Sequence, residues 1–184
     1  MCLERYIVEQ CAPTLASIKT GTMFGVVEDD ASELMRQVHN WREVLAHKGL
    51  ILTVLRYRSG RALIYLGRVS QLTRDLSDPD AAGLLKSCGY CQFGAGEVLE
   101  RLRERLLSNE GFPHEIGLFL GYPFADVIGY IQNAGKNSKC TGYWQVYGDE
   151  QAAMRKFTAY RKCREVYKRL WNSGRSVLEL TVAA

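Results

Sequence analysis

The chain has 184 residues, of which 47% are hydrophobic and 24% are charged, and its formal net charge is +4. This composition is typical of a globular protein, and with four prolines and no biased tract it excludes a disordered chain. The length suits one globular domain spanning residues 1–184. The net charge is too small to indicate nucleic-acid binding by itself.

The first residues, 1–6, lack the apolar segment of a secretory signal, and no apolar run approaches the roughly 18 residues that span a bilayer. Six cysteines in a chain without such a signal indicate reduced thiols. We therefore expect a cytoplasmic protein that has no disulfide framework and does not bind a membrane.

Helical periodicity and turn residues divide the first 110 residues into helices and extended segments. Helices are expected at 3–11, 30–49, 69–87 with a break before Pro79, and 97–108. Asp30 suits the N-cap of the second helix, and Glu33 three residues later suits a capping box. Extended segments are expected at 14–19, 24–27 and, as a β-hairpin around the turn 58–60, at 50–57 and 61–66.

The stretch from Gly111 to Pro123 combines glycines, apolar residues and a histidine, and we interpret it as a strand. Alternation with period two then places His114 on an apolar face. The opposite face would carry Glu115, Gly117, Phe119 and Gly121. Its two glycines leave that face flat, which suits either a planar ligand or a closely packed helix.

Pro123 ends this stretch and can open a short helix at 124–132. A basic turn at 136–139 and a strand at 141–147 are expected to follow. The last helix, expected at 149–172, is strongly basic, because positions 151–175 hold eight Lys or Arg and one acid. Together the elements predict an α+β protein with a mostly antiparallel sheet of about 4–5 strands, helices packed on it, and a long basic C-terminal helix.

Four segments carry a resemblance to a known family: CAPTLASIK at 11–19, FPHEIGLFLGYP at 112–123, DVIG at 126–129 and GYWQVY at 142–147. In these segments the chain resembles the bacterial family numbered 3793 in the domain-of-unknown-function series, which is seen mostly in anaerobic Firmicutes. The resemblance covers essentially the whole chain and implies a cytoplasmic bacterial protein. It carries no established activity, so no catalytic residue is transferred from it.

His114 and Glu115 are the candidate catalytic residues. His114 suits acid–base chemistry if it lies at the mouth of a pocket, and Glu115 suits the orientation of a polar group. Alternatively, His114 is a partly buried histidine near the start of a strand. Cys11 is a third candidate, because a thiolate paired with His114 would be a nucleophile, although its Ala-Pro context also suits a structural cysteine.

Cys88 and Cys91 form a lone CxxC motif in a glycine-rich connection, outside the pattern of the family named above. They are candidate metal ligands, but a structural zinc site needs about four ligands. Cys140, Cys163 or a histidine would have to supply the others.

Two functions from different classes remain open. The first is binding of a small molecule or cofactor, with redox or metal chemistry among the options, in a pocket around FPHEIGLFLGYP. Its ligand-binding residues would be Lys19, Gly117, Phe119, Tyr122, Lys136, Tyr143 and Trp144. The second is a non-enzymatic adaptor that docks an acidic protein or nucleic acid through the basic last helix. The sequence identifies neither the cofactor nor a reaction.

Overall fold

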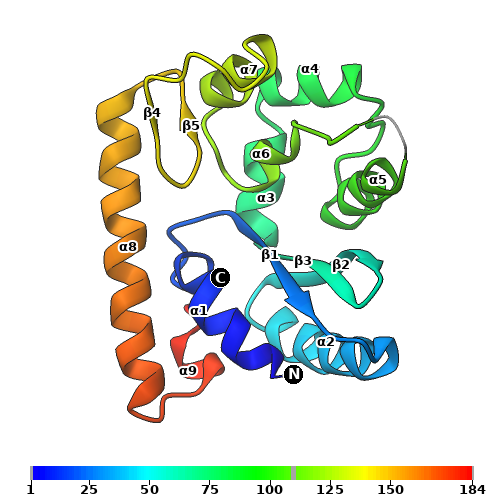
Figure 1. The fold of residues 1–184 in the computed structure, drawn as a ribbon, viewed down its shortest axis with the longest axis vertical. Helices are drawn as coiled ribbons and strands as arrows, with labels where there is room; N and C mark the ends of the chain where they lie inside the picture. The colour runs from blue at the N-terminus through cyan, green and yellow to red at the C-terminus, as the bar shows by residue number, and fades with distance from the viewer. Residues whose placement is uncertain (1, 109–110, 184) are drawn as a thin grey trace.

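An antiparallel sheet of three strands separates two groups of helices (Figure 1). The computed structural model describes residues 2–108 and 111–183. The strands are β1 (Gly21–Val27), β2 (Leu50–Arg58) and β3 (Arg61–Arg68), in the order β1-β3-β2. The predicted hairpin is therefore confirmed, and its second strand is the centre of the sheet. Alternate side chains of β3 enter two different cores, because successive residues of a strand face opposite sides.

The first core lies between one face of the sheet and the helices α1 (Leu3–Leu15), α2 (Ala31–Ala46) and α9 (Val177–Leu180). Its fully buried side chains include Ile7, Leu34, Leu52 and Ile64. Asp30 caps α2 as predicted, accepting from the backbone N–H of Ser32 and Glu33 at 2.9 and 3.1 Å. The capping box is not formed, because the Asp30 N–H donates to Glu28 and the Glu33 carboxylate pairs with Arg36.

The second core lies on the other face of the sheet. It is built by α3 (Val69–Leu76), α4 (Pro79–Ser87), α5 (Ala95–Leu107), α6 (Ile116–Phe119) and α7 (Phe124–Gln132). The break between α3 and α4 falls where it was predicted, with Pro79 in the first turn of α4. Tyr65 ties α6 to the sheet by donating its hydroxyl to the Phe119 carbonyl at 2.8 Å.

A third, smaller core packs a two-stranded hairpin against the long last helix. The hairpin consists of β4 (Cys140–Thr141) and β5 (Gln145–Val146), and the helix is α8 (Glu150–Asn172). In Figure 1, α8 runs the length of the molecule beside the rest of the chain. The α+β class is confirmed, but the strands are divided between two sheets. The segment 141–147, predicted as one strand, instead contains the last residue of β4, the turn of the hairpin and β5.

The strand predicted for 111–123 is wrong. Its centre forms the short helix α6, preceded by a turn in which the Ile116 N–H bonds to the Pro113 carbonyl at 3.2 Å. All residues from Glu115 to Leu120 are buried, so the segment has no exposed face of the kind that a half-buried strand presents. A short apolar run of this kind fits a buried helix as well as a strand.

The strand predicted for 14–19 is also wrong, because α1 continues through Pro13 to Leu15. Proline cannot donate the helical hydrogen bond to the residue four positions earlier. That acceptor, the Glu9 carbonyl, instead receives the Nε of Arg164 from α8 at 3.1 Å. No helix in the described ranges is both long and apolar enough to cross a membrane.

Candidate functional site

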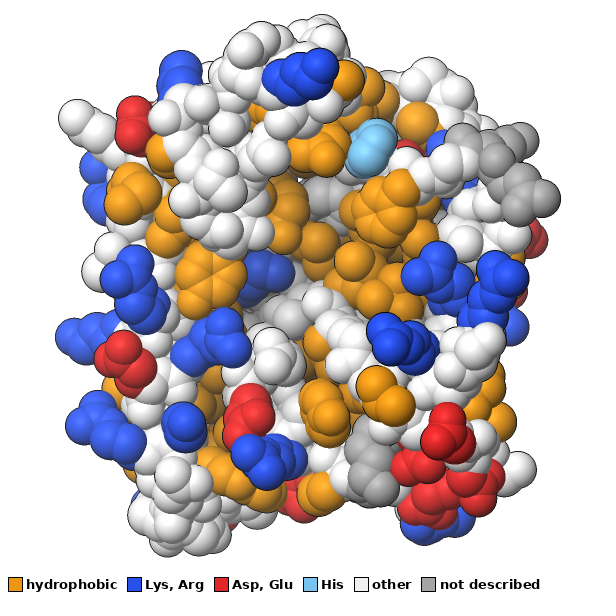
Figure 2. All heavy atoms as spheres, viewed as in Figure 1, with side chains coloured by type: hydrophobic (Ala, Val, Ile, Leu, Met, Phe, Trp, Pro, Cys, Tyr) orange, Lys and Arg blue, Asp and Glu red, His pale blue; other side chains and the backbone are white. Residues whose placement is uncertain are grey.

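An open cavity of about 540 Å³ lies between the segment around α6, the helix α7 and the β4–β5 hairpin. Figure 2 shows hydrophobic side chains gathered around a hollow in this part of the molecule, with a histidine at its edge. Five predicted site residues line the cavity: His114, Gly117, Tyr122, Tyr143 and Trp144. The cavity brings together residues that are 30 positions apart in the chain.

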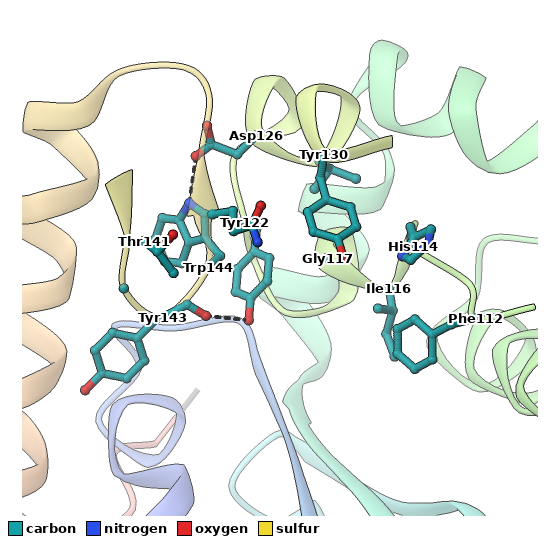
Figure 3. A pocket seen from close by; sticks show the side chains of 13 residues that line it. Phe112, His114, Ile116, Gly117, Tyr122, Asp126, Tyr130, Thr141, Tyr143 and Trp144 are labelled. Carbon is teal, nitrogen blue, oxygen red and sulfur yellow. Dashed lines mark hydrogen bonds between the residues drawn. The ribbon is translucent and has the colours of Figure 1, made fainter. Parts of the chain in front are cut away.

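One wall of this aromatic pocket is a stacked pair of rings, Tyr122 and Trp144, whose centroids are 4.8 Å apart with planes at 27°. The Tyr122 hydroxyl donates to the Tyr143 carbonyl at 3.2 Å, which fixes the ring against the hairpin turn (Figure 3). Trp144 also packs against Phe157 of α8 in an edge-to-face arrangement, with the ring centroids 4.5 Å apart. Both rings of the wall are therefore fixed by contacts within the protein, Tyr122 by the hairpin turn and Trp144 by α8.

Asp126, in the first turn of α7, anchors the hairpin to that helix. Its buried carboxylate accepts from the Trp144 indole at 2.7 Å and from the backbone N–H groups of Tyr147 and Gly148 at 2.8 and 2.7 Å. Three charge-assisted hydrogen bonds compensate its loss of hydration. Gly129, one turn later, permits this close approach, since a Cβ there would lie 2.4 Å from that of Tyr147.

The other side of the aromatic pocket is more open. The His114 ring lies 5.0 Å from the ring of Tyr130 and 5.8 Å from that of Phe112, and all three line the cavity (Figure 3). The polar groups of His114, Tyr130 and Tyr143 make no side-chain hydrogen bond within residues 2–108 and 111–183. The imidazole of His114 and the hydroxyl of Tyr130 are available to a ligand, whereas the Asp126 carboxylate is fully engaged by the protein.

Glu115 lies outside the aromatic pocket. Its carboxylate accepts from the Arg105 guanidinium at 2.6 Å and from the Tyr90 hydroxyl at 3.1 Å, and only 4% of the side chain is exposed. Burial, followed by the neighbouring Glu115 charge, raises the pKa of Tyr90 well above its usual range. Because Glu115 joins α5 to the turn before α6, its contacts are those of a structural ion pair.

Four other candidates lie away from the aromatic pocket. Phe119 is fully buried in the second core, and Lys136 is exposed on the turn after α7. Cys11 is fully buried in α1, and burial raises the pKa of its thiol, which disfavours the nucleophilic thiolate. Lys19 is also buried, but it lines a different cavity.

Cys88 and Cys91 flank the buried Tyr90 at the end of α4. Cys88 is half-buried, and burial together with the Glu115 charge raises the pKa of its thiol. Cys91 is exposed. Among the described residues, no group of three or more His, Cys, Asp or Glu side chains is arranged to hold a metal ion. The motif therefore contributes two thiols without further ligands from the described chain.

Asp126, Tyr130 and Phe112 were not predicted as site residues. Phe112 lies at the start of the segment expected to be a strand, and Tyr130 lies within the helix expected at 124–132, and neither position carries a local sequence signal of its own. Asp126 carries a usable signal, because an acid in the first turn of an apolar helix is favoured by the helix dipole. Its partners in the hairpin become evident only once the chain is folded.

The chain was also compared with known proteins. The family DUF3793, described as a protein of unknown function, matches residues 7–181. No curated protein and no solved structure matches the chain. Because the match extends over nearly all of the sequence, the chain belongs to the DUF3793 family.

Proposed function

We propose that the protein binds a small, planar and largely apolar molecule in the aromatic pocket. The observation that carries this proposal is the preformed wall of Tyr122 stacked on Trp144, which faces an open volume of about 540 Å³. This volume lies within the range of about 300–1,000 Å³ that is typical of small-molecule pockets. Aromatic walls favour planar ligands, because flat rings stack on one another in offset geometry.

The pocket also offers a few hydrogen-bonding groups that would orient such a ligand. The imidazole of His114 and the hydroxyl of Tyr130 lie on the open side, whereas the Tyr143 ring packs against Phe157 and Tyr160 and its hydroxyl points away from the pocket (Figure 3). The Asp126 carboxylate, which also lines the pocket, accepts three hydrogen bonds from the protein, so its oxygens are engaged by the hairpin and not by a ligand. The ligand we expect is therefore uncharged in the pocket, with a polar edge directed to His114.

NMR titration of the labelled protein with 2-naphthol, a planar probe with one hydroxyl, tests this proposal. We expect backbone shifts confined to the pocket, for example at Gly117, Tyr130 and Thr141. Phe112→Ala removes a ring that is 49% exposed, so it should preserve the fold and weaken probe binding roughly tenfold. Leu178→Ala, at a 41% exposed position on α9, is the matched control and should leave binding unchanged.

Two outcomes would contradict the proposal. One is a set of shifts scattered over the surface, which indicates non-specific adsorption. The other is equal affinity in Phe112→Ala and the original protein. Native mass spectrometry of the protein purified from its own cells supplies an independent check, since a retained ligand should be lost in Phe112→Ala.

A second candidate function is docking of an acidic protein or nucleic acid on α8. Figure 2 shows Lys and Arg side chains along the edge that α8 forms. Six basic residues of α8 are exposed and form no ion pair with the described chain: Arg155, Lys156, Arg161, Lys162, Lys168 and Arg169. Charge of this kind favours polyanions through counterion release.

Arg161→Glu combined with Lys168→Glu tests docking, because the two positions are seven residues apart on one face of the helix. Binding of a single-stranded oligonucleotide or an acidic peptide should be lost in this variant and should weaken steeply with salt. Salt-independent binding, or binding that survives both charge reversals, would argue against this function. All six cysteines are free thiols, which supports the cytoplasm as the place of action for either function.

A further inference from the structure

A second cavity, of about 580 Å³, lies on the other side of Tyr122 from the aromatic pocket. Its walls come from the loop after α1, from α3, from the first turns of α4 and α7, and from α8. Tyr122 lines both cavities, but the second one is lined mainly by polar and charged side chains. None of the functions considered above uses it.

Lys19 is the unusual residue of this second cavity, because its side chain is buried although it carries a charge. Only 7% of the residue is exposed. The ammonium has three donors, of which one is directed to the Gly21 carbonyl, and it lies 5.6 Å from the centre of the Tyr122 ring. It forms no ion pair with a carboxylate in the described ranges. Buried charges are usually paired with an opposite charge. The Lys19 ammonium is an exception to this rule among the described residues.

The acids of the same cavity are mostly engaged by other groups. Asp75 accepts from Thr20 at 2.5 Å and from Arg74 at 2.8 Å. Asp78 caps α4 by accepting from the N–H groups of Asp80 and Ala81. Neither Asp78 nor Asp80 has a side-chain partner in the described chain, and Asp78 is engaged by backbone N–H groups alone. Lys156 of α8 also lines the cavity and forms no ion pair with the described chain. Four charged groups of the cavity therefore form no ion pair within the described residues, and of these only Lys19 is buried, whereas Lys156, Asp78 and Asp80 are exposed.

The start of α7 adds a second feature that favours an anion. Pro123 is its N-cap and cannot provide a side-chain cap, and both Pro123 and Phe124 line the cavity. The first backbone N–H groups of a helix carry a partial positive charge and are a common binding site for anionic oxygens. The carboxylate in this first turn, Asp126, is occupied by the hairpin.

We propose that this second cavity binds a small molecule through a carboxylate or phosphate group, with the Lys19 ammonium as its charge partner. Lys156 and the first turn of α7 would complete the anion site. The remaining volume would hold the body of the ligand against Tyr122 and Tyr160. This site is separate from the aromatic pocket, and either site can exist without the other.

Calorimetric titration with inorganic phosphate and with succinate, at constant ionic strength set by chloride, tests the proposal and distinguishes the two anions. Lys19→Met removes the ammonium and keeps a similar side-chain length, and we expect it to weaken anion binding at least tenfold. The matched control is Lys136→Met, which removes the same charge from an exposed site outside the cavity and should bind as the original protein does. Equal binding by both variants would overturn the proposal, as would failure of the original protein to bind either anion.

A second measurement needs no variant and so does not depend on how Lys19→Met folds. Burial lowers the pKa of Lys19 to about 8, and a bound anion would favour the charged form and raise that pKa. At pH 8 the labelling of Lys19 by acetic anhydride, followed by peptide mass spectrometry, should slow severalfold when phosphate or succinate is bound. Labelling of Lys136 should not change. If neither anion slows the labelling of Lys19, the site does not exist.

Discussion

The Nε of Arg164 donates to the Glu9 carbonyl at 3.1 Å, and this contact compensates the hydrogen bond that Pro13 removes from α1. The guanidinium also reaches the Gln10 amide oxygen at 3.5 Å. A helix with a proline near its end is thereby joined to a helix more than 150 residues later in the chain. The contact ties the basic helix α8 to the first core.

Replacement of Arg164 by Ala should lower the free energy of unfolding by about 1–2 kcal/mol, because the part-buried Glu9 carbonyl loses its donor. Pro13→Ala restores a backbone N–H four residues after Glu9. In that background Arg164→Ala should cost less than about 0.5 kcal/mol, since the carbonyl then has a helical partner. Urea unfolding of the four proteins in this double-mutant cycle measures the coupling. If Arg164→Ala lowers the free energy of unfolding equally with Pro13 and with Ala at position 13, Arg164 acts through another contact.

Glu115→Gln should destabilise the protein by about 3 kcal/mol, because it removes the charge of a buried carboxylate that pairs with Arg105 and accepts from Tyr90. Glu104→Gln is the matched control, since the Glu104–Arg101 pair is largely exposed and should cost at most about 1 kcal/mol. Both are measured by urea unfolding. If the two substitutions lower the free energy of unfolding by the same amount, Glu115 is not a structural anchor, and it is again a candidate ligand-binding residue.

Asp126→Asn should destabilise the hairpin packing by about 2–3 kcal/mol. The Asn side chain has one acceptor oxygen, and its NH₂ group opposes the donors that now converge on the carboxylate from Trp144, Tyr147 and Gly148. The wall of the aromatic pocket should loosen, so the fluorescence of Trp144 should shift to longer wavelength and naphthol binding should weaken. Unchanged tryptophan fluorescence together with unchanged stability would refute this role.

Because Lys19 is buried and its pKa is lowered, we expect the stability of the protein to depend on pH in a specific way. Burial lowers its folded-state pKa to about 8 from 10.5, so between these values the unfolded chain binds more protons than the folded one. Stability of the original protein should therefore rise from pH 8 to pH 10.5 by about 3 kcal/mol relative to Lys19→Met. At pH 7 Lys19→Met should be the more stable protein, because it has no ammonium to bury. Parallel stability curves for the two proteins would contradict the lowered pKa.

Much of the fold could be predicted from local patterns. The helices around Leu34, Leu102 and Phe157 follow the 3.6-residue period, and the turn after Arg58 joins two strands rich in branched residues. The segment 111–123 could not be predicted in this way, because every residue from Glu115 to Leu120 is buried and no period separates helix from strand. The helix through Pro13 was missed because its compensating donor comes from Arg164.

The sequence by itself determined the class of the protein and most of its helices, because these depend on periodicity, caps and turn residues within short windows. Its family followed from the resemblance of four segments, and the family match over residues 7–181 confirms it. The sequence also indicated that His114, Tyr122 and Trp144 belong to one region. Only the tertiary structure decided that Glu115 faces Arg105 and that Asp126 fastens the hairpin, because side-chain direction and burial depend on segments far apart in the chain. For the same reason, only the folded chain places Lys19 in a separate cavity, where no described carboxylate forms an ion pair with it.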